Sequence, residues 1–232
     1  MARLLPLLER ALPHSRDDSR RTLVNRARIA RIGRQGLIFK QGDRMPLVLI
    51  VDGHAAFQRT TVEGRLLIVG VANPGALIGL TSMSGVKGMG EMVALTDAVV
   101  AMWDGAELRD LVAADADLGL DVIDGLALFL VLMTEKLDGY LHQDARRRVI
   151  RVLARHRALF FADPPILSRA HLPGLVGTSR EMTGRVLRDL EREGAVARVG
   201  RTGLRLLDAD RLSETSEGDE PIALDRRRSQ YT

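Results

Sequence analysis

The chain has 232 residues, of which 46% are hydrophobic, and it carries 34 basic and 30 acidic side chains, no cysteine and a formal net charge of +4. The absence of cysteine excludes a disulfide scaffold, a thiolate-held iron–sulfur cluster, a zinc–cysteine site and a cysteine nucleophile. The longest wholly apolar run near the middle, Leu126–Met133, is far shorter than the ~20 residues that span a bilayer. Residues 1–9 do not read as a signal peptide, so we expect a soluble, cytoplasmic protein without a membrane partner.

The charge is distributed unevenly along the chain. Residues 1–40 carry ten basic and three acidic side chains, and residues 41–142 carry six and fourteen. Residues 143–211 carry fifteen basic and eight acidic side chains. An acidic middle between two basic ends indicates separate duties, and a basic block is a candidate for binding a polyanion.

The N-terminal part is predicted to be one short helix followed by β-structure. Leucines on one side of residues 3–12 predict an amphipathic helix. From Arg26 to Trp103, short apolar or alternating runs between turn signals predict an antiparallel barrel or roll, with a hairpin turn at Glu63-Gly64. The expected strands lie at residues 27–32, 37–40, 47–51, 55–61, 66–71, 92–95 and 98–103.

A helical period replaces the β-pattern after Asp104. Asp104 and Glu107 predict a capping box for a helix that ends near Val112, and a long helix is predicted from about residue 115 to 139 or beyond. Apolar residues at spacings of three and four predict a coiled-coil seam in this helix, which we interpret as a dimer helix rather than a buried helix in a larger monomer. The predicted seam consists of Ile123, Leu126, Leu130, Met133, Leu137 and Tyr140. The residues expected to face the roll instead are Val122, Phe129 and Val131.

The C-terminal part is predicted to be a winged helix-turn-helix. A basic helix over residues 142–161 should end at Asp163-Pro164-Pro165. Ser168 is expected to cap a helix that ends near Val176, and a left-handed turn at Gly177 should lead to a second helix capped by Ser179 and stopped by Gly194. Residues 196–199 and 204–207 then form the wing, and the polar residues 212–232 are expected to be a disordered tail.

The second of these helices carries the residues with DNA-reading chemistry. An arginine pairs bidentately with guanine and a glutamate accepts from the cytosine amino group, so the exposed face at the helix N-terminus is suited to reading base edges. The predicted base contacts are Arg180, Glu181, Thr183 and Arg185. The predicted phosphate contacts are Arg169, Ser179, Arg188 and Arg201. The alternative, a charged helix face that only meets solvent, does not account for the turn glycine, cap serine, apolar stripe and wing occurring together.

The run Val176-Gly177-Thr178-Ser179-Arg180-Glu181-Met182-Thr183-Gly184-Arg185-Val186-Leu187 resembles the recognition segment of the Crp–Fnr family of bacterial transcription regulators. The resemblance extends over residues 25–211 and implies an α+β fold: an N-terminal antiparallel β-roll of the double-stranded β-helix type, a dimerisation helix and a C-terminal winged helix-turn-helix. The implied limits are 1–114, 115–141 and 142–211. The family also implies base contacts by Arg180, Glu181 and Arg185, phosphate contacts by Arg169 and Ser179, and RNA polymerase as a partner.

The effector pocket departs from the cyclic-nucleotide-binding members of the family. Leu80, after Gly79, stands where their ribose-binding glutamate would be, and their phosphate-binding Arg-Ser pair falls near Gly88-Met89, with Lys87 as the nearest cation. Losing both charge-assisted contacts argues against binding of cyclic AMP unless Lys87 substitutes. The candidate pocket residues are Gly79, Leu80, Lys87, Met89 and Thr134.

The methionines of the same region leave the effector question open. Met83, Met89 and Met92 could line a site for haem or another apolar effector, or could simply pack, and plain packing is preferred. No cofactor and no metal site is predicted. The cysteine-free sequence excludes the family's oxygen-sensing iron–sulfur branch, and a regulator that is active without any ligand is as plausible as a ligand-controlled one.

These patterns predict a sequence-specific DNA-binding transcription regulator that acts as a homodimer on a near-palindromic operator. The alternative is a small-molecule-binding regulatory module whose winged helix docks a protein partner. We do not expect an enzyme, because the sequence contains no nucleophile–base–acid set, no Walker loop and no metal-ligand spacing.

Overall fold

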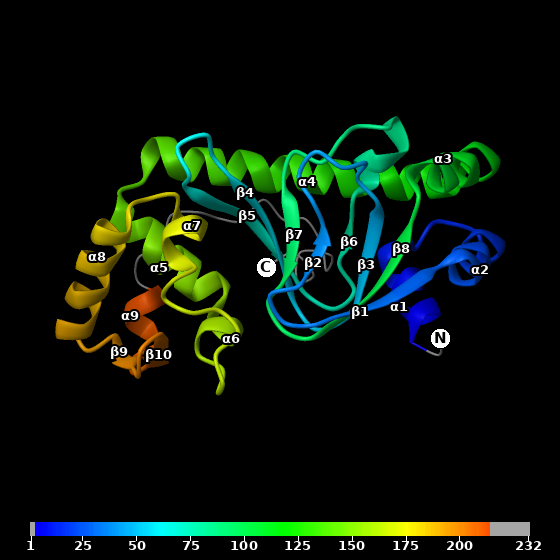
Figure 1. The fold of residues 1–232 in the computed structure, drawn as a ribbon. Coiled ribbons are helices and arrows are strands. Elements are labelled where there is room, and N and C mark those ends of the chain that lie inside the picture. Colours follow the sequence, from blue (N-terminus) through cyan, green and yellow to red (C-terminus); the bar gives the residue numbers. More distant parts are fainter. Residues whose placement is uncertain (1–2, 214–232) are drawn as a thin grey trace. The chain divides into compact units, whose positions relative to one another are not determined.

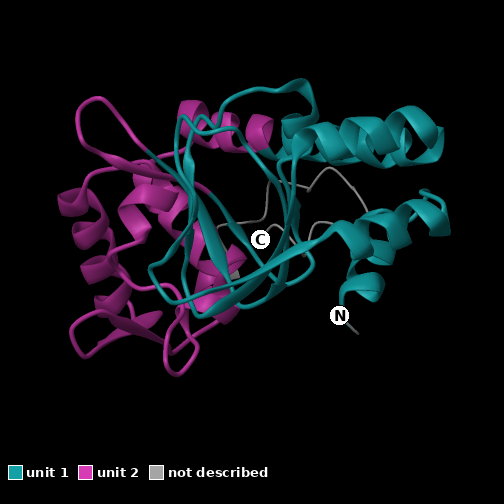
Figure 2. Cartoon of the chain, turned by 45° about the vertical axis from the view of Figure 1, so that its right-hand side comes forward, with its two compact units in different colours: residues 1–59, 70–132, 225–232 teal, residues 60–69, 133–224 magenta. Residues whose placement is uncertain are grey.

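A computed structural model describes residues 3–213 of the chain, and its secondary structure has the predicted α+β character (Figure 1). The described residues divide into two compact units (Figure 2). One unit contains residues 3–59 and 70–132, and the other contains residues 60–69 and 133–213. The division therefore falls inside the long helix and detaches a hairpin tip from the roll, whereas the sequence suggested limits after residues 114 and 141.

The β-roll consists of two four-stranded antiparallel sheets. One sheet has the order β1 (Arg28–Ile32), β8 (Ala98–Trp103), β3 (Leu47–Asp52) and β6 (Leu77–Ile78). The other has the order β2 (Leu37–Phe39), β7 (Glu91–Ala94), β4 (Ala55–Thr60) and β5 (Leu66–Ala72). All seven predicted runs are strands, and only the two-residue β6 was too short to predict. The predicted hairpin turn is also present, because Gly64, with φ +74°, donates its N–H to the Thr61 carbonyl at 2.9 Å.

Strand β3 of the first sheet is buried on both faces. Its alternate side chains Val48 and Ile50 join an apolar cluster with Phe39 and Met92 of the second sheet. Leu47 and Leu49 point the other way, into a cluster that includes helical residues. A strand buried on both faces reads as a continuous apolar run, as residues 47–51 do here.

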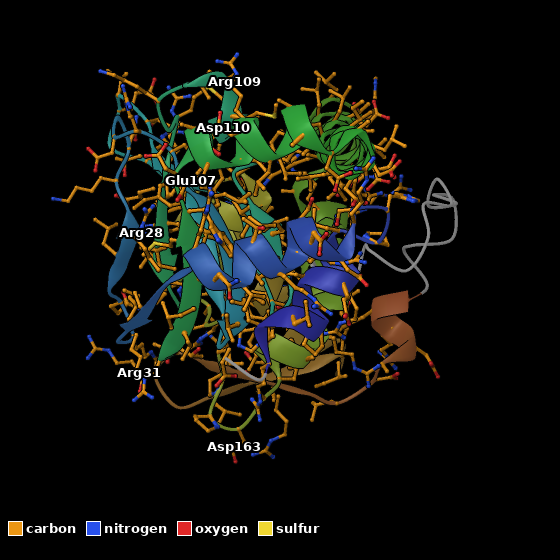
Figure 3. The ribbon with its side chains drawn as sticks, turned by 90° about the vertical axis from the view of Figure 1, so that its right-hand side faces the viewer. Arg28, Arg31, Glu107, Arg109, Asp110 and Asp163 are labelled. Atoms are coloured by element: carbon orange, nitrogen blue, oxygen red, sulfur yellow. The ribbon has the colours of Figure 1, made fainter. Side chains whose placement is uncertain are left out.

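Helices cover the outer face of that sheet (Figure 1). They are α1 (Leu4–Ala11), α2 (Asp17–Arg26), the 3-10 helix η1 (Leu80–Ser84), α3 (Gly105–Ala114) and the first part of α4 (Ala116–His142). The Asp104–Glu107 capping box of α3 is confirmed, and Glu107 also lies 3.9 Å from Arg28 of β1 (Figure 3). Helix α2 was not predicted, because only Ser19 and Leu23 of its residues are buried and no apolar stripe marks it.

The second unit contains the C-terminal elements. They are α5 (Ala145–Arg155), α6 (Arg157–Phe160), α7 (Leu172–Val176), α8 (Arg180–Arg192), β9 (Val196–Val199), β10 (Gly203–Leu206) and α9 (Asp210–Ser213). Three details correct the sequence-based expectations. The basic helix is interrupted at His156, and α7 begins at Leu172 with no cap from Ser168, whose N–H donates instead to His171 Nδ1 at 2.9 Å. Leu212, the first residue of the expected tail, is buried in α9, and residues 214–232 lie outside the described part.

Helix α4 is buried on one side and open on the opposite side within the described chain. Positions seven residues apart, Leu118, Gly125, Leu132 and Gly139, face the chain's own elements. The exposed stripe repeats at spacings of three and four and consists of Leu120, Ile123, Ala127, Leu130, Thr134, Leu137 and Leu141. The predicted seam shares Ile123, Leu130 and Leu137 with this stripe, whereas Leu126, Met133 and Tyr140 are partly buried on its flank. Phe129, which was expected to face the roll, is instead 48% exposed.

None of the helices within residues 3–213 has the length and apolar character needed to cross a membrane. The same residues contain no group of three or more His, Asp or Glu side chains arranged to hold a metal ion.

Candidate nucleic-acid interface

The turn between α7 and α8 fixes where the second helix begins. Gly177 adopts φ +67°, the left-handed conformation that a residue with a Cβ rarely adopts, and its N–H donates to the Pro173 carbonyl at 2.9 Å. Ser179 then caps α8, because its Oγ accepts from the Met182 N–H at 3.1 Å. The predicted helix-turn-helix geometry is therefore present at the predicted residues. The cap occupies the Ser179 hydroxyl oxygen, so any phosphate contact by this residue uses its remaining donors.

Helix α8 separates apolar and charged side chains cleanly. Val186, Leu187 and Leu190 are buried, and the charged side chains Arg180, Glu181, Arg185 and Arg188 are exposed. Four of the predicted contact residues are thus exposed on α8, three of them in the N-terminal half of the helix.

Thr183 does not belong to that face, contrary to our prediction. Its side chain is 2% exposed, and its hydroxyl donates to the Ser179 carbonyl at 2.9 Å. Thr183, Leu187 and Leu190 follow the i, i+4, i+7 spacing of one helix face, which places the threonine in the apolar stripe. A buried hydroxyl that is already committed cannot read a base, so Thr183 is withdrawn from the base contacts.

One of the exposed arginines, Arg188, lies near Gly184, a residue that the sequence analysis did not single out. The guanidinium of Arg188 lies 3.8 Å from the position that a Cβ of Gly184 would occupy, and nothing else comes within 4 Å of that position. Arg185 pairs with Glu181 one turn earlier at 3.5 Å between Nη2 and Oε1. Exposed i, i+4 pairs of this kind are weak, so both groups remain available to a stronger partner such as a base edge.

The wing is tied to the helices by arginines. Arg169 donates through Nη2 to the carbonyls of Gly200, at 3.1 Å, and Arg201, so this guanidinium shapes the wing turn and meets phosphate only through its remaining N–H groups. Arg198, which the sequence analysis missed, donates through Nε to Glu191 Oε2 at 2.8 Å, and this bond lowers the pKa of Glu191. Arg201 lies exposed at the wing tip, as a phosphate contact requires.

The candidate effector residues differ in burial and are divided between the two units. Leu80 is buried against the helical cluster, and its Cδ1 lies only 2.3 Å from where a Cβ of Gly125 would be. Lys87 is exposed, Met89 is 75% exposed, and Thr134 lies on the open stripe of α4 in the other unit. Gly79 is explained by its backbone conformation, because its φ is +89° and a Cβ there would clash with the Pro46 carbonyl.

In the segment that aligns with the phosphate-binding pair, the backbone groups of Gly88 are hydrogen-bonded to other residues of the chain. The Gly88 N–H donates to the Asp43 carbonyl at 2.9 Å, and the Gly88 carbonyl accepts from Gly42 at 2.8 Å. The suggested methionine lining is also absent, because Met92 is in the interior cluster of the roll, Met83 packs on the outer cluster and Met89 faces solvent. The three methionines belong to separate segments, and their side chains point to different surroundings, which sequence spacing alone could not reveal.

Comparisons with known proteins agree with this arrangement. Residues 147–215 match the family model of the Crp-like helix-turn-helix domain, and residues 31–115 match the model of the cyclic nucleotide-binding domain. The chain is 28% identical over 177 residues to the cAMP-activated global transcriptional regulator Vfr of Pseudomonas aeruginosa, covering 71% of this chain and 83% of Vfr.

Two solved structures illustrate the likeness of fold. The c-di-GMP-responsive global regulator CLP of Xanthomonas campestris matches with a TM-score of 0.69 and 22% identity, covering 82% of this chain and 99% of that one. A transcriptional regulator of the crp/fnr family from Eubacterium rectale matches with a TM-score of 0.73 and 14% identity, covering 86% of this chain and 94% of that one.

Proposed function

The chain belongs to the Crp–Fnr family of transcription regulators, and from this premise we propose that it binds a near-palindromic operator as a homodimer without requiring cyclic AMP. The observation that carries the proposal is the open face of α8, on which Arg180, Glu181 and Arg185 stand in the first turns of a helix capped by Ser179. In a helix-turn-helix these N-terminal turns enter the major groove. Arg180 and Arg185 would read guanine and Glu181 would read cytosine, while Arg188 and Arg201 would contact phosphates.

The open stripe of α4 supports a second copy of this chain as the dimer partner. Its apolar members Ile123, Leu130 and Leu137 recur every seven residues and are each more than half exposed. A heptad stripe that the protein's own elements leave uncovered has the pattern of a coiled-coil seam, which supports pairing with a second copy. Pairing along it would present two copies of α8 to successive major grooves, ~34 Å apart, which requires an operator with two half-sites. RNA polymerase as a further partner follows only from the family.

Independence from cyclic AMP is supported by what occupies the corresponding region. A cyclic phosphate needs a fixed cation and free backbone donors, but the Gly88 N–H is committed to Asp43 and Leu80 replaces a polar ligand with a buried apolar side chain. Apolar side chains from both sheets, among them Phe39, Ile50 and Met92, pack into one cluster between them. The cAMP activation of Vfr is therefore not carried over to this chain.

Selection of bound DNA from a random pool, followed by fluorescence anisotropy on the selected operator, tests the function. Arg185→Ala should relax preference at one base position in each half-site and weaken binding by roughly 5- to 150-fold, the equivalent of ~1–3 kcal/mol. Arg109→Ala is the matched control, because this arginine of α3 is exposed in the first unit, as its side chain at the upper edge of Figure 3 illustrates. The control removes one positive charge and should leave base preference unchanged.

The same titrations test the effector proposal and the alternative function. Adding cyclic AMP or cyclic di-GMP should leave operator affinity within about twofold, and a tenfold gain with either would overturn ligand independence. A module that only docks a protein would show no selected half-sites and no steep loss of DNA affinity with salt.

A further inference from the structure

Three elements of the second unit meet at one place. They are the end of α4, the hairpin tip of residues 60–69, and helix α7, and Figure 2 shows the tip and these helices in the same colour. The tip connects β4 and β5 of the roll, yet it packs within the unit that carries the DNA-reading helix. Its contacts with that unit are therefore candidates for a functional role.

Lys136 of α4 holds the tip through the backbone of β5. Its ammonium donates to the carbonyls of Ile68 at 2.6 Å and Val69 at 3.1 Å. Strand β5 is the last strand of its sheet, so an edge of backbone groups is open to such a partner. Burial and the nearby Arg155 lower the pKa of Lys136 to about 8, so the group is still mostly charged at pH 7.

Strand β5, which Lys136 holds, packs closely against α7. A Cβ on Gly174 would lie 3.1 Å from the Leu66 carbonyl oxygen and 3.1 Å from Ile68 Cγ1. Gly174 is buried, and the absence of a side chain lets the strand approach the helix this closely.

The C-terminal end of α7 is held by α4 directly. The ring of Tyr140 packs over Gly177, whose Cβ would lie 2.6 Å from Tyr140 Cε1. On α5, the guanidinium of Arg148 lies 5.7 Å from the centroid of the Tyr140 ring. Ser179, the cap of α8, follows Gly177 by two residues, so the ring bears on the turn that sets where the reading helix starts.

We infer that Lys136 and Tyr140 are positioning residues for DNA reading, and that the hairpin tip 60–69 is part of the reading unit. The two residues lie one helical turn apart on α4. Lys136 holds the middle of α7 through the hairpin, and Tyr140 holds its C-terminal end by contact. Because α7 leads directly into the turn and cap of α8, both residues set the angle at which α8 is presented. The inference rests on the proposed function, since it concerns how the same helix meets its operator.

The test measures tolerance to half-site spacing with the full-length protein. Operators with the optimal spacer and with one base pair more or fewer are titrated by anisotropy against wild type, Lys136→Met and Gly174→Ala. A positioning role predicts that the preference for the optimal spacer falls by about 3- to 30-fold in both variants, and that Lys136→Arg, which keeps a cation, recovers part of it. Tyr140→Phe, which keeps the ring over Gly177, should behave as wild type, and Tyr140→Ala should not. Val62→Ser at the exposed end of the tip is the control and should change nothing.

The outcomes separate this inference from a structural role and from the proposed function. A purely structural role would lower the midpoint of urea unfolding in Lys136→Met and Gly174→Ala while leaving the spacer preference of the folded protein unchanged, and that result overturns the inference. If Lys136→Met does not fold, Gly174→Ala decides, because it disturbs the same junction from α7 with a single methyl group. If Arg185→Ala binds as wild type, the proposed DNA reading itself fails, whatever the junction variants do.

Discussion

Truncating Leu130 on the open stripe of α4 should dissociate the proposed dimer. Leu130 is 67% exposed in the single chain and lies at the centre of the stripe. Fully burying a leucine side chain is worth about 2–3 kcal/mol, so covering the exposed two-thirds contributes about 1.5 kcal/mol per copy. A two-fold interface uses the residue twice, which gives about 3 kcal/mol for Leu130→Ala, or roughly 100-fold weaker dimerisation.

The neighbouring Phe129 provides the matched control. It is 48% exposed and also apolar, but it lies off the seven-residue repeat of the stripe. Phe129→Ala should therefore leave the dimer constant within about twofold, since its exposed area is not in the seam. Sedimentation equilibrium over a concentration series measures both variants. Equal weakening by the two changes, or a larger effect at Phe129, would refute the assignment of the seam.

Three further changes have expected outcomes that follow from buried groups. Thr183→Val keeps the side-chain volume and removes one hydrogen bond to the Ser179 carbonyl, so the free energy of unfolding should change by less than about 1 kcal/mol and the selected operator should stay the same. A changed base preference would return Thr183 to the reading face. Leu80→Ala should destabilise the protein to urea by about 2–4 kcal/mol, and adding Gly125→Ala should restore part of this because the new methyl group points into the vacated space. The pKa of Lys136, about 8 when folded, is below the value of 10.5 for a free lysine, so the folded state binds fewer protons between these values. The free energy of unfolding of the wild type, compared with that of Lys136→Met, should thus rise by up to about 3 kcal/mol as the pH increases from 8 to 10.5. Urea titrations in which this difference falls with pH would contradict the expected sign.

The elements that sequence analysis located correctly are those with local physical signals. Asp104 and Glu107 satisfy orphan N–H groups at the start of α3, and Gly64 adopts a left-handed conformation that residues with a Cβ rarely adopt, so each signal fixes one boundary by itself. Helix α2 lacks such a signal, because it is held by tertiary contacts: Ser19 donates to Asp115 at 2.6 Å, and the Leu23 carbonyl accepts from Trp103 Nε1 at 2.8 Å. Contacts across about 80 to 100 residues leave no trace in a local pattern.

The candidate site divides in the same way. Charge and capping identified the reading helix, but the side on which a polar residue lies was decided incorrectly for Thr183, although its spacing to Leu187 and Leu190 already placed it among the buried residues. The coiled-coil seam shows the harder case. Stripes through Leu126 and Met133 or through Ala127 and Thr134 have the same three-four spacing, and hydropathy favours the first. Only burial against the chain's own elements identifies the second as the open one.

Helix α4 is the element through which the proposed dimer and the reading unit have to influence each other. Its a and d positions, such as Ala127 and Leu130, face outward, and Lys136 and Tyr140 hold α7 farther along the same helix. A strict seven-residue repeat drifts against 3.6 residues per turn, so two such helices must supercoil when they pair, and groups attached to them shift with the backbone. Coupling of this kind is reciprocal at equilibrium. Operator DNA should therefore tighten the dimer by the same factor by which dimerisation tightens operator binding, and in Lys136→Met, where the attachment is weakened, both factors should shrink together.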